Sequence, residues 1–157
     1  MPLAENEVSA SAEDSVSYSA VTSCFTLTAA LENGKLLGAH LSLDKSSGRD
    51  CTNALADLKA RISASNQRVA AICGVGQSGF WSSSYFTAAP DFDRSSGAGA
   101  SGGIGSRSLA SSALPEIIDT DAYYDGDLPH DGLPQVFGLA DKTGEFTVTW
   151  DGTRFSV

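Results

Sequence analysis

The sequence predicts a mixed α/β (α+β) fold in which largely antiparallel strands are flanked by two main helices. Three patterns indicate this class: an Asn33-Gly34 pair between two strand-like runs, an amphipathic stripe over residues 50–65, and two further strand-like runs near the C-terminus. Asn-Gly between apolar runs is the strongest short-range signal for a β-hairpin. The 157 residues suit one domain.

The first hairpin is expected to pair residues 18–31 with residues 35–43, both rich in β-branched and apolar side chains. Residues 1–17 are acidic and aperiodic, which is typical of a flexible N-terminal arm. We therefore expect a flexible arm over residues 1–17 and a single domain over residues 18–157.

Helical spacing is clearest in residues 50–65, where Leu55, Leu58 and Ile62 form one apolar stripe. A second helix is expected over residues 106–118, interrupted by Pro115. The remaining pattern predicts a buried strand over residues 68–73 and a further strand over 80–87. A Gly/Ser-rich loop is expected over 91–105 and an acidic turn-rich segment over 119–133. Residues 135–140 and 145–150 are expected to form a C-terminal hairpin.

Charge and hydropathy exclude several classes of function. The formal net charge is −9, and an acidic surface repels phosphate backbones, so nucleic-acid binding is not expected. No apolar run approaches the roughly 20 residues of a membrane helix, so membrane insertion is not expected either. The N-terminus lacks the basic start and apolar stretch of a cleavable signal peptide. We expect a cytoplasmic protein, or an effector delivered from the cytoplasm into a target cell.

The cysteine content argues against cross-linking and structural metal. Three cysteines without Cys-x-x-Cys spacing fit neither a disulfide framework nor a zinc site. We expect Cys51, on the helical stripe, and Cys73, in an apolar run, to be core residues. No cofactor and no metal are expected.

Cys24 and His40, on either side of the Asn-Gly turn, are the candidates for a catalytic pair. A cysteine attacks as the thiolate, so it needs a base or a cation nearby. The register of the hairpin decides whether the two side chains meet.

A two-residue turn would place His40 opposite Leu27 and put Cys24 on the other face of the sheet. A three-residue loop ending at a left-handed Gly34 would place His40 opposite Thr26. Cys24 would then be a diagonal neighbour of His40 on the same face, roughly 7 Å away at the backbone. We predict the second register, because it sorts the hairpin into an apolar face (Phe25, Leu27, Leu41, Leu43) and a more polar one (Thr22, Cys24, Thr26, His40, Ser42).

The stretch from Thr22-Ser23-Cys24 through the turn to residues 38–43 resembles the chemotaxis receptor glutamine deamidase (CheD) family, in which a cysteine is paired with a histidine on a following strand. Residues 55–76, 104–107 and 143–148 resemble, in order, its helix and strand, its I-G-x-R helix start and its terminal hairpin. Residues 21–24 are also similar to the Cys-His motif of cytotoxic necrotizing factor-like toxins. Tyr18 stands where the CheD family carries a threonine, and Asp44 where it often carries a proline.

The resemblance implies sandwich-like sheet layers and a protein-glutamine deamidase. Cys24 would be the nucleophile and His40 the base, and the partner would be a protein that presents a glutamine side chain. Thr22 or a backbone carbonyl would orient the imidazole, and backbone N–H groups near Ser23 and Cys24 would hold the oxyanion. A thiol amidase, transglutaminase or protease could use the same pair. A non-catalytic module docking a basic partner is the alternative of another class.

Two further motifs favour structural roles. Residues 74–79 match G-x-G-x-x-G, but a strand-like run follows them where a dinucleotide site needs a helix, so a tight turn is expected. The acidic segment at residues 119–131 lacks EF-hand spacing and its closing glutamate, so a solvated loop is expected. His130 in this segment is an alternative candidate base.

Overall fold

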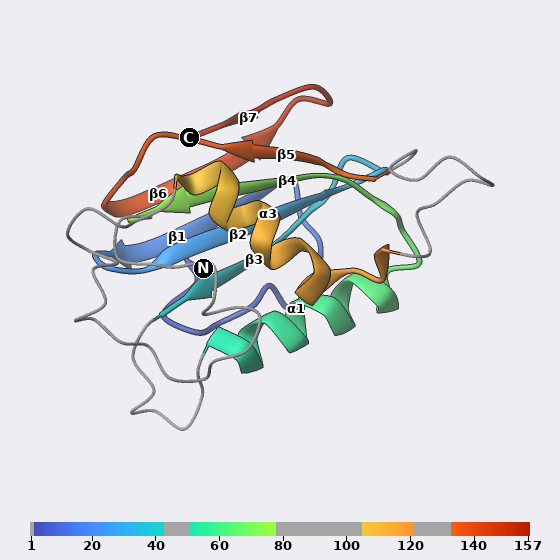
Figure 1. The fold of residues 1–157 in the computed structure, drawn as a ribbon, viewed down its shortest axis with the longest axis horizontal. Helices are drawn as coiled ribbons and strands as arrows, with labels where there is room; N and C mark the ends of the chain where they lie inside the picture. The colour runs from blue at the N-terminus through green and yellow to red at the C-terminus, as the bar shows by residue number, and fades with distance from the viewer. Residues whose placement is uncertain (1, 43–50, 78–104, 121–132) are drawn as a thin grey trace.

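The computed structural model describes residues 2–42, 51–77, 105–120 and 133–157 (Figure 1). The described elements, in chain order, are β1 (Ser15–Val21), β2 (Phe25–Leu31), β3 (Leu36–Leu41), α1 (Cys51–Ala64), β4 (Val69–Gly76), α3 (Ser106–Ile117), β5 (Gln135–Gly138), β6 (Gly144–Trp150) and β7 (Phe155–Ser156). They confirm the expected α+β class with two main helices and largely antiparallel sheets. None of the helices in these ranges is long and apolar enough to cross a membrane.

The elements form three layers, which Figure 1 shows with the helices on one side of the larger sheet and β6 and β7 on the other. The larger sheet has the strand order β3-β2-β4-β5, and the smaller one the order β1-β6-β7. One hydrophobic core lies between the larger sheet and the two helices. A second core lies between the two sheets and holds Cys24.

The β2–β3 hairpin has the register that the sequence predicts. Phe25 pairs with Leu41 and Thr26 with His40. A three-residue loop closes the hairpin, with Leu31 N donating to Lys35 O at 2.9 Å. Gly34 has φ +88°, the left-handed conformation that glycine adopts without a steric penalty. The predicted register of the hairpin is confirmed.

This register sends alternate side chains to different cores. Phe25, Leu27 and Leu41 belong to the core under the helices. Thr26 and His40 project to the opposite face, where the Tyr18 ring of β1 lies edge-on to the imidazole with 6.0 Å between ring centroids. His40 is therefore enclosed between the two sheets.

Both helices occur where helical spacing predicts them, with α1 over Cys51–Ala64 and α3 over Ser106–Ile117. Pro115 does not end α3 early. Pro115 lies three residues before the C-terminal cap. Proline has no N–H to donate to the carbonyl of Ser111, one turn earlier, but Ser111 is exposed, so water can pair with this carbonyl.

A tight turn is expected at the glycine motif of residues 74–79, but its first three residues belong to strand β4, which continues through Gly76; residues 78 and 79 lie outside the described ranges. A Cβ at Gly74 would lie 2.4 Å from the Phe25 ring and 2.8 Å from the Ser106 carbonyl oxygen of α3. Glycine here allows the helix and the hairpin to approach β4 closely, which is a packing role.

The C-terminal runs do not pair with each other as expected. β5 pairs in parallel with β4, whereas β6 pairs antiparallel with β1 and β7. Their connection stays attached to β4, because Leu139 N donates to Gly74 O and Lys142 N donates to Gly76 O. The chain therefore crosses from one sheet to the other at the point where a hairpin was expected.

The N-terminal residues 2–14 differ most from their expected form, a mobile arm. They lie along the free edge of β3, with antiparallel bridges from Val8 to Ala39 and from Glu13 to Leu36. Lys35 also forms an ion pair with Asp14 at 2.6 Å. Backbone hydrogen bonds, which depend little on side-chain hydrophobicity, fix this acidic segment, and the first strand begins at Ser15 rather than residue 18.

Four expectations fall on residues outside the described ranges. They are the strand at residues 80–87, most of the Gly/Ser-rich loop at 91–105, most of the acidic segment at 119–133, and the alternative base His130.

The packing of β1 on the hairpin predicts that Gly38→Ala lowers the free energy of unfolding by about 1–3 kcal/mol. An added Cβ would lie 2.1 Å from the Tyr18 hydroxyl oxygen and 2.7 Å from a Val16 methyl carbon. Chemical denaturation measures the effect. Gly105→Ala is the matched control, because its Cβ would have no neighbour within 4 Å.

A double-mutant cycle with Tyr18→Phe identifies the clash. That change alone removes hydrogen bonds from Tyr18 to Leu27 O and Thr28 Oγ1. In the Gly38→Ala background, Tyr18→Phe also removes the hydroxyl oxygen with which the new methyl group clashes. The double variant should therefore lose less stability than the sum of the losses in the two single variants. Strictly additive losses would contradict this packing.

Candidate active site

Cys24 and His40 lie on the same face of the larger sheet. His40 pairs with Thr26, two residues beyond Cys24, which makes the cysteine its diagonal neighbour across the hairpin. Both side chains face the second sheet: Cys24 packs in the same core cluster as Tyr18, and the Tyr18 ring contacts the imidazole. Both residues are 0% exposed.

The contacts of His40 define its tautomer. Its Nδ1 lies 2.8 Å from the backbone carbonyl oxygen of Leu3. A carbonyl oxygen only accepts, so Nδ1 carries the proton and the neutral ring has its lone pair on Nε2. Nε2 is buried and has no hydrogen-bond partner among the described residues.

Burial lowers the pKa of His40 below its usual 6.5. The Leu3 hydrogen bond and the negative charges of Glu5 and Glu7 act in the opposite direction and are smaller. The imidazole is therefore neutral at pH 7, as a general base must be before it accepts a proton.

Cys24 is held as a neutral thiol. Its Sγ donates a hydrogen bond to Glu5 Oε1 at 3.6 Å. Burial first, and then the Glu5 charge, raise the pKa of the thiol to about 11, although backbone and side-chain hydrogen bonds from Thr22 and Ser42 lower it. A thiol in this state reacts slowly, because only the thiolate is a nucleophile.

The Glu5 carboxylate bridges Cys24, which precedes β2, and Ser42, which follows β3. One carboxylate oxygen accepts from Cys24, and the other accepts from Ser42 Oγ at 3.4 Å. Glu5 is itself exposed, whereas Cys24 beneath it is not. The Glu5 side chain thus lies between the thiol and solvent.

Cys24 and His40 share a face without a hydrogen bond between them. The thiol bonds to Glu5, and Nε2 of the imidazole has no partner among the described residues. In this arrangement the thiol is protonated and the Nε2 lone pair is free.

Thr22 and Ser23 form the bend between β1 and β2, where Thr22 is exposed and Ser23 half-buried. Of the two groups expected to orient the imidazole, Thr22 or a backbone carbonyl, the Leu3 carbonyl is the one bonded to it. Tyr18 packs against the ring and hydrogen-bonds to Thr28 Oγ1.

Sequence analysis did not identify Leu3 and Glu5 as part of the site. Both belong to the segment expected to be mobile, and neither lies in a periodic pattern. Ser42 could be placed on the Cys24 face by register alone, but its contact with Glu5 could not.

The other two cysteines are buried free thiols, in agreement with expectation. Cys51 lies in the core under the helices, and Cys73 lies in the core between the sheets that also holds Cys24. In the described part of the chain, no group of three or more His, Cys, Asp or Glu side chains is placed to hold a metal ion.

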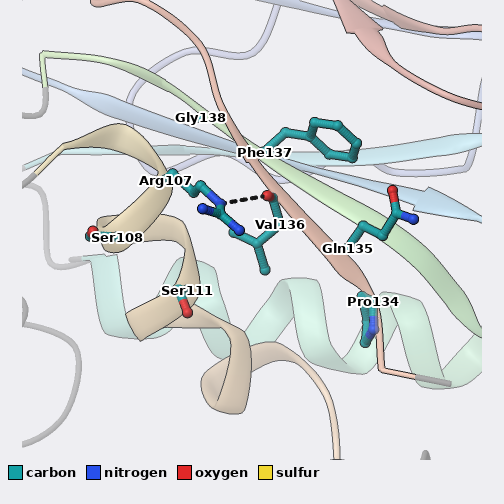
Figure 2. Close-up of a pocket in the computed structure, with 8 residues that line it drawn as sticks. All are labelled: Arg107, Ser108, Ser111, Pro134, Gln135, Val136, Phe137 and Gly138. Atoms are coloured by element: carbon teal, nitrogen blue, oxygen red, sulfur yellow. Dashed lines mark hydrogen bonds between the residues drawn. The ribbon is translucent and has the colours of Figure 1, made fainter. Parts of the chain in front are cut away.

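A hollow at the described surface lies elsewhere. It has a volume of about 810 Å³. It is bordered by α3 and by β5 with the adjacent Pro134, as Figure 2 shows. Arg107 crosses it and donates from Nε to Val136 O at 3.2 Å. Neither Cys24 nor His40 lines it.

No family model, no curated protein and no solved structure matches this chain. The geometry of the site itself therefore carries the functional argument.

The Glu5 contact predicts that Glu5→Met makes Cys24 more reactive towards iodoacetamide at neutral pH. The thioether side chain is similar in length but lacks the charge that raises the thiol pKa, and it carries no amide that could be hydrolysed. The rate should increase roughly tenfold for each unit by which the pKa falls. Mass spectrometry of the alkylated peptides measures it, with Cys51 and Cys73 in the same molecule as references for intact folding.

In wild-type protein, Cys24 alkylation should rise with pH up to about 11, the pKa of its thiol. A variant rate equal to that of the wild type across this range would show that Glu5 does not control the thiol.

The buried neutral His40 predicts that the protein loses stability as the pH falls below 6.5. The unfolded chain then binds a proton that the folded site, with its lowered pKa, does not, so the free energy of unfolding decreases with falling pH. Thermal unfolding of wild type and His40→Gln between about pH 7 and pH 5 tests this. The slope should be shallower in the variant, and equal slopes would contradict it.

Proposed function

We propose that this chain is a protein-glutamine deamidase in which Cys24 is the nucleophile and His40 the base. The observation that carries the proposal is the β2–β3 register, which puts the two side chains on one sheet face. The orientation of the imidazole supports it. Leu3 O accepts a hydrogen bond from Nδ1–H, so the lone pair of the ring is on Nε2, where it can accept a proton.

The reaction begins when Cys24 Sγ attacks the Cδ carbon of a target glutamine while its proton moves to His40 Nε2. His40 then returns this proton to the amide nitrogen, the C–N bond breaks, and ammonia leaves. The product of this half-reaction is a thioester between Cys24 and the target.

Water completes the reaction. It gives a proton to His40 Nε2 and attacks the thioester carbon, the C–S bond breaks, and the proton returns to the thiol. The target now carries glutamate. Backbone N–H groups near Ser23 and Cys24 would stabilise the oxyanion in both steps, with Thr22 at the solvent side of this bend.

The charge of the chain suits a protein target with a basic surface, because opposite charges favour the encounter. The family resemblance admits two settings. One is a chemotaxis-receptor-type enzyme in the cytoplasm, and the other is a bacterial effector toxin delivered into a target cell.

The resting state of the thiol favours a second candidate, a non-catalytic module of the same fold that docks a basic partner. Cys24 is fully buried and protonated, as a structural cysteine is. A net charge of −9 would serve partner binding equally well.

The deamidase proposal predicts glutamine-to-glutamate shifts of about +1 Da in proteins of cells that express the wild-type chain. Cys24→Ser should abolish these shifts, and His40→Gln should reduce them by about 10²- to 10⁴-fold. Quantitative proteomics measures them. Cys51→Ser is the matched control, because this other buried thiol has no role in the chemistry.

Including Glu5→Ala in the series ensures that the contact above Cys24 does not hide the activity. If neither wild type nor Glu5→Ala differs from its Cys24→Ser counterpart, and each still binds the same partners, the binding-module candidate replaces the deamidase.

A further inference from the structure

The N-terminal segment pairs with the free edge of β3 through isolated bridges and main-chain hydrogen bonds. Asn6 N donates to His40 O at 2.6 Å, His40 N donates to Glu7 O at 3.0 Å, and Ser9 N donates to Gly38 O at 2.9 Å. These bonds use main-chain groups of the β3 edge, so they do not depend on the identity of the side chains. Main-chain pairing with an exposed sheet edge is a recurring way in which proteins bind peptides.

The same segment is also attached to the second sheet. Leu3 N donates to Ser17 O at 2.8 Å, and Ser19 N donates to Leu3 O at 3.1 Å. Residues 3–9 therefore span from the edge of β1 to the edge of β3, and they contact both Cys24 and His40. Glu5 lies between these two anchors.

The backbone at Asn6 directs this crossing. Its φ of +60° is in the left-handed region, which asparagine tolerates better than most residues. Its side-chain oxygen accepts from Ser42 N at 3.0 Å. The turn is thus fixed at the residue that follows Glu5.

The Glu5 side chain has the chemistry of a deamidation product. Its carboxylate contacts Cys24 Sγ through one oxygen and Ser42 Oγ through the other. Glutamate is what remains beside the cysteine after a glutamine has been hydrolysed, and a carboxamide has the same shape as a carboxylate.

We infer that residues 3–9 occupy the substrate site as a bound product analogue, and that the substrate is a peptide segment that turns at its glutamine, as residues 4–7 do, with that side chain in the place of Glu5 and the following residues paired with the β3 edge. This inference rests on the proposed function and specifies its substrate class. It requires the chain's own N-terminal segment to leave before a target peptide binds.

The electrostatics of the site agree with this assignment. The negative charge of Glu5 raises the thiol pKa, whereas a neutral glutamine at the same place would not. Substrate would therefore favour ionisation of Cys24, and product would oppose it.

The test converts the analogue into a substrate. Glu5→Gln places a carboxamide at Cys24, and we expect it to be hydrolysed back to glutamate, with a mass increase of about 1 Da at residue 5. The reaction should follow first-order kinetics with a rate independent of protein concentration, because it occurs within one molecule. Peptide mapping by mass spectrometry follows it over time in the purified full-length chain.

Two controls define the chemistry. Glu5→Gln combined with Cys24→Ser should keep the amide. Glu7→Gln, in the same segment, should also keep its amide, because Glu7 bonds to Ala4 N rather than to Cys24. Equal conversion at residues 5 and 7, or conversion that persists without Cys24, would overturn the inference.

The proteome experiment separates the two proposals. An unchanged amide at residue 5, in a chain that still deamidates cellular proteins through Cys24, overturns the substrate assignment and leaves the deamidase standing. An unchanged amide together with no Cys24-dependent deamidation in wild type or Glu5→Ala overturns both.

Discussion

The register of the β2–β3 hairpin is the constraint on which the rest of the molecule depends. A left-handed Gly34 closes a three-residue loop, and the loop places Thr26 opposite His40. A slip of one residue would turn every side chain of the slipped strand to the other face of the sheet. With Phe25 and Leu27 kept in the core under the helices, His40 would enter that core beside Leu27. The same turn therefore determines both the packing of the sheet and the composition of the site.

Sequence predicted those parts of the fold that depend on local chemistry. The Asn-Gly turn and the Leu55-Leu58-Ile62 stripe each act over a few residues, and both were predicted correctly. The partners of β5 and β6 depend on contacts distant in sequence, which alternation of apolar residues does not encode. The N-terminal segment escaped prediction because its binding rests on main-chain hydrogen bonds to β3, and acidic composition does not reveal these.

The site was predictable to the same extent. Register places Cys24 and His40 on one face, and no further information is needed for that inference. Leu3 and Glu5 come to the site only because residues 3–9 cross from one sheet to the other. Burial has the largest effect on the pKa of both groups, and these two residues add to it: the Leu3 carbonyl selects the imidazole tautomer and the Glu5 charge raises the thiol pKa further. The hairpin therefore determines the positions of the pair, and residues 3–9 complete its hydrogen bonds and electrostatics.

A buried cysteine and histidine would ordinarily indicate a structural pair, because burial disfavours both the thiolate and the imidazolium. Those are the two charged forms that proton transfer between them creates, and they appear together. An ion pair formed inside a low-dielectric site is stabilised by mutual attraction in a way that neither ion is alone. The enclosure between the sheets thus opposes ionisation of either group separately, whereas the proposed transfer from Sγ to Nε2 would create both charges together. A carboxylate at the thiol would add a negative charge beside the nascent thiolate, and its replacement by a neutral amide would remove that repulsion. Burial raises the thiol pKa most and the Glu5 charge adds to it, so the occupant of the Glu5 position is the part of this barrier that a substrate would change.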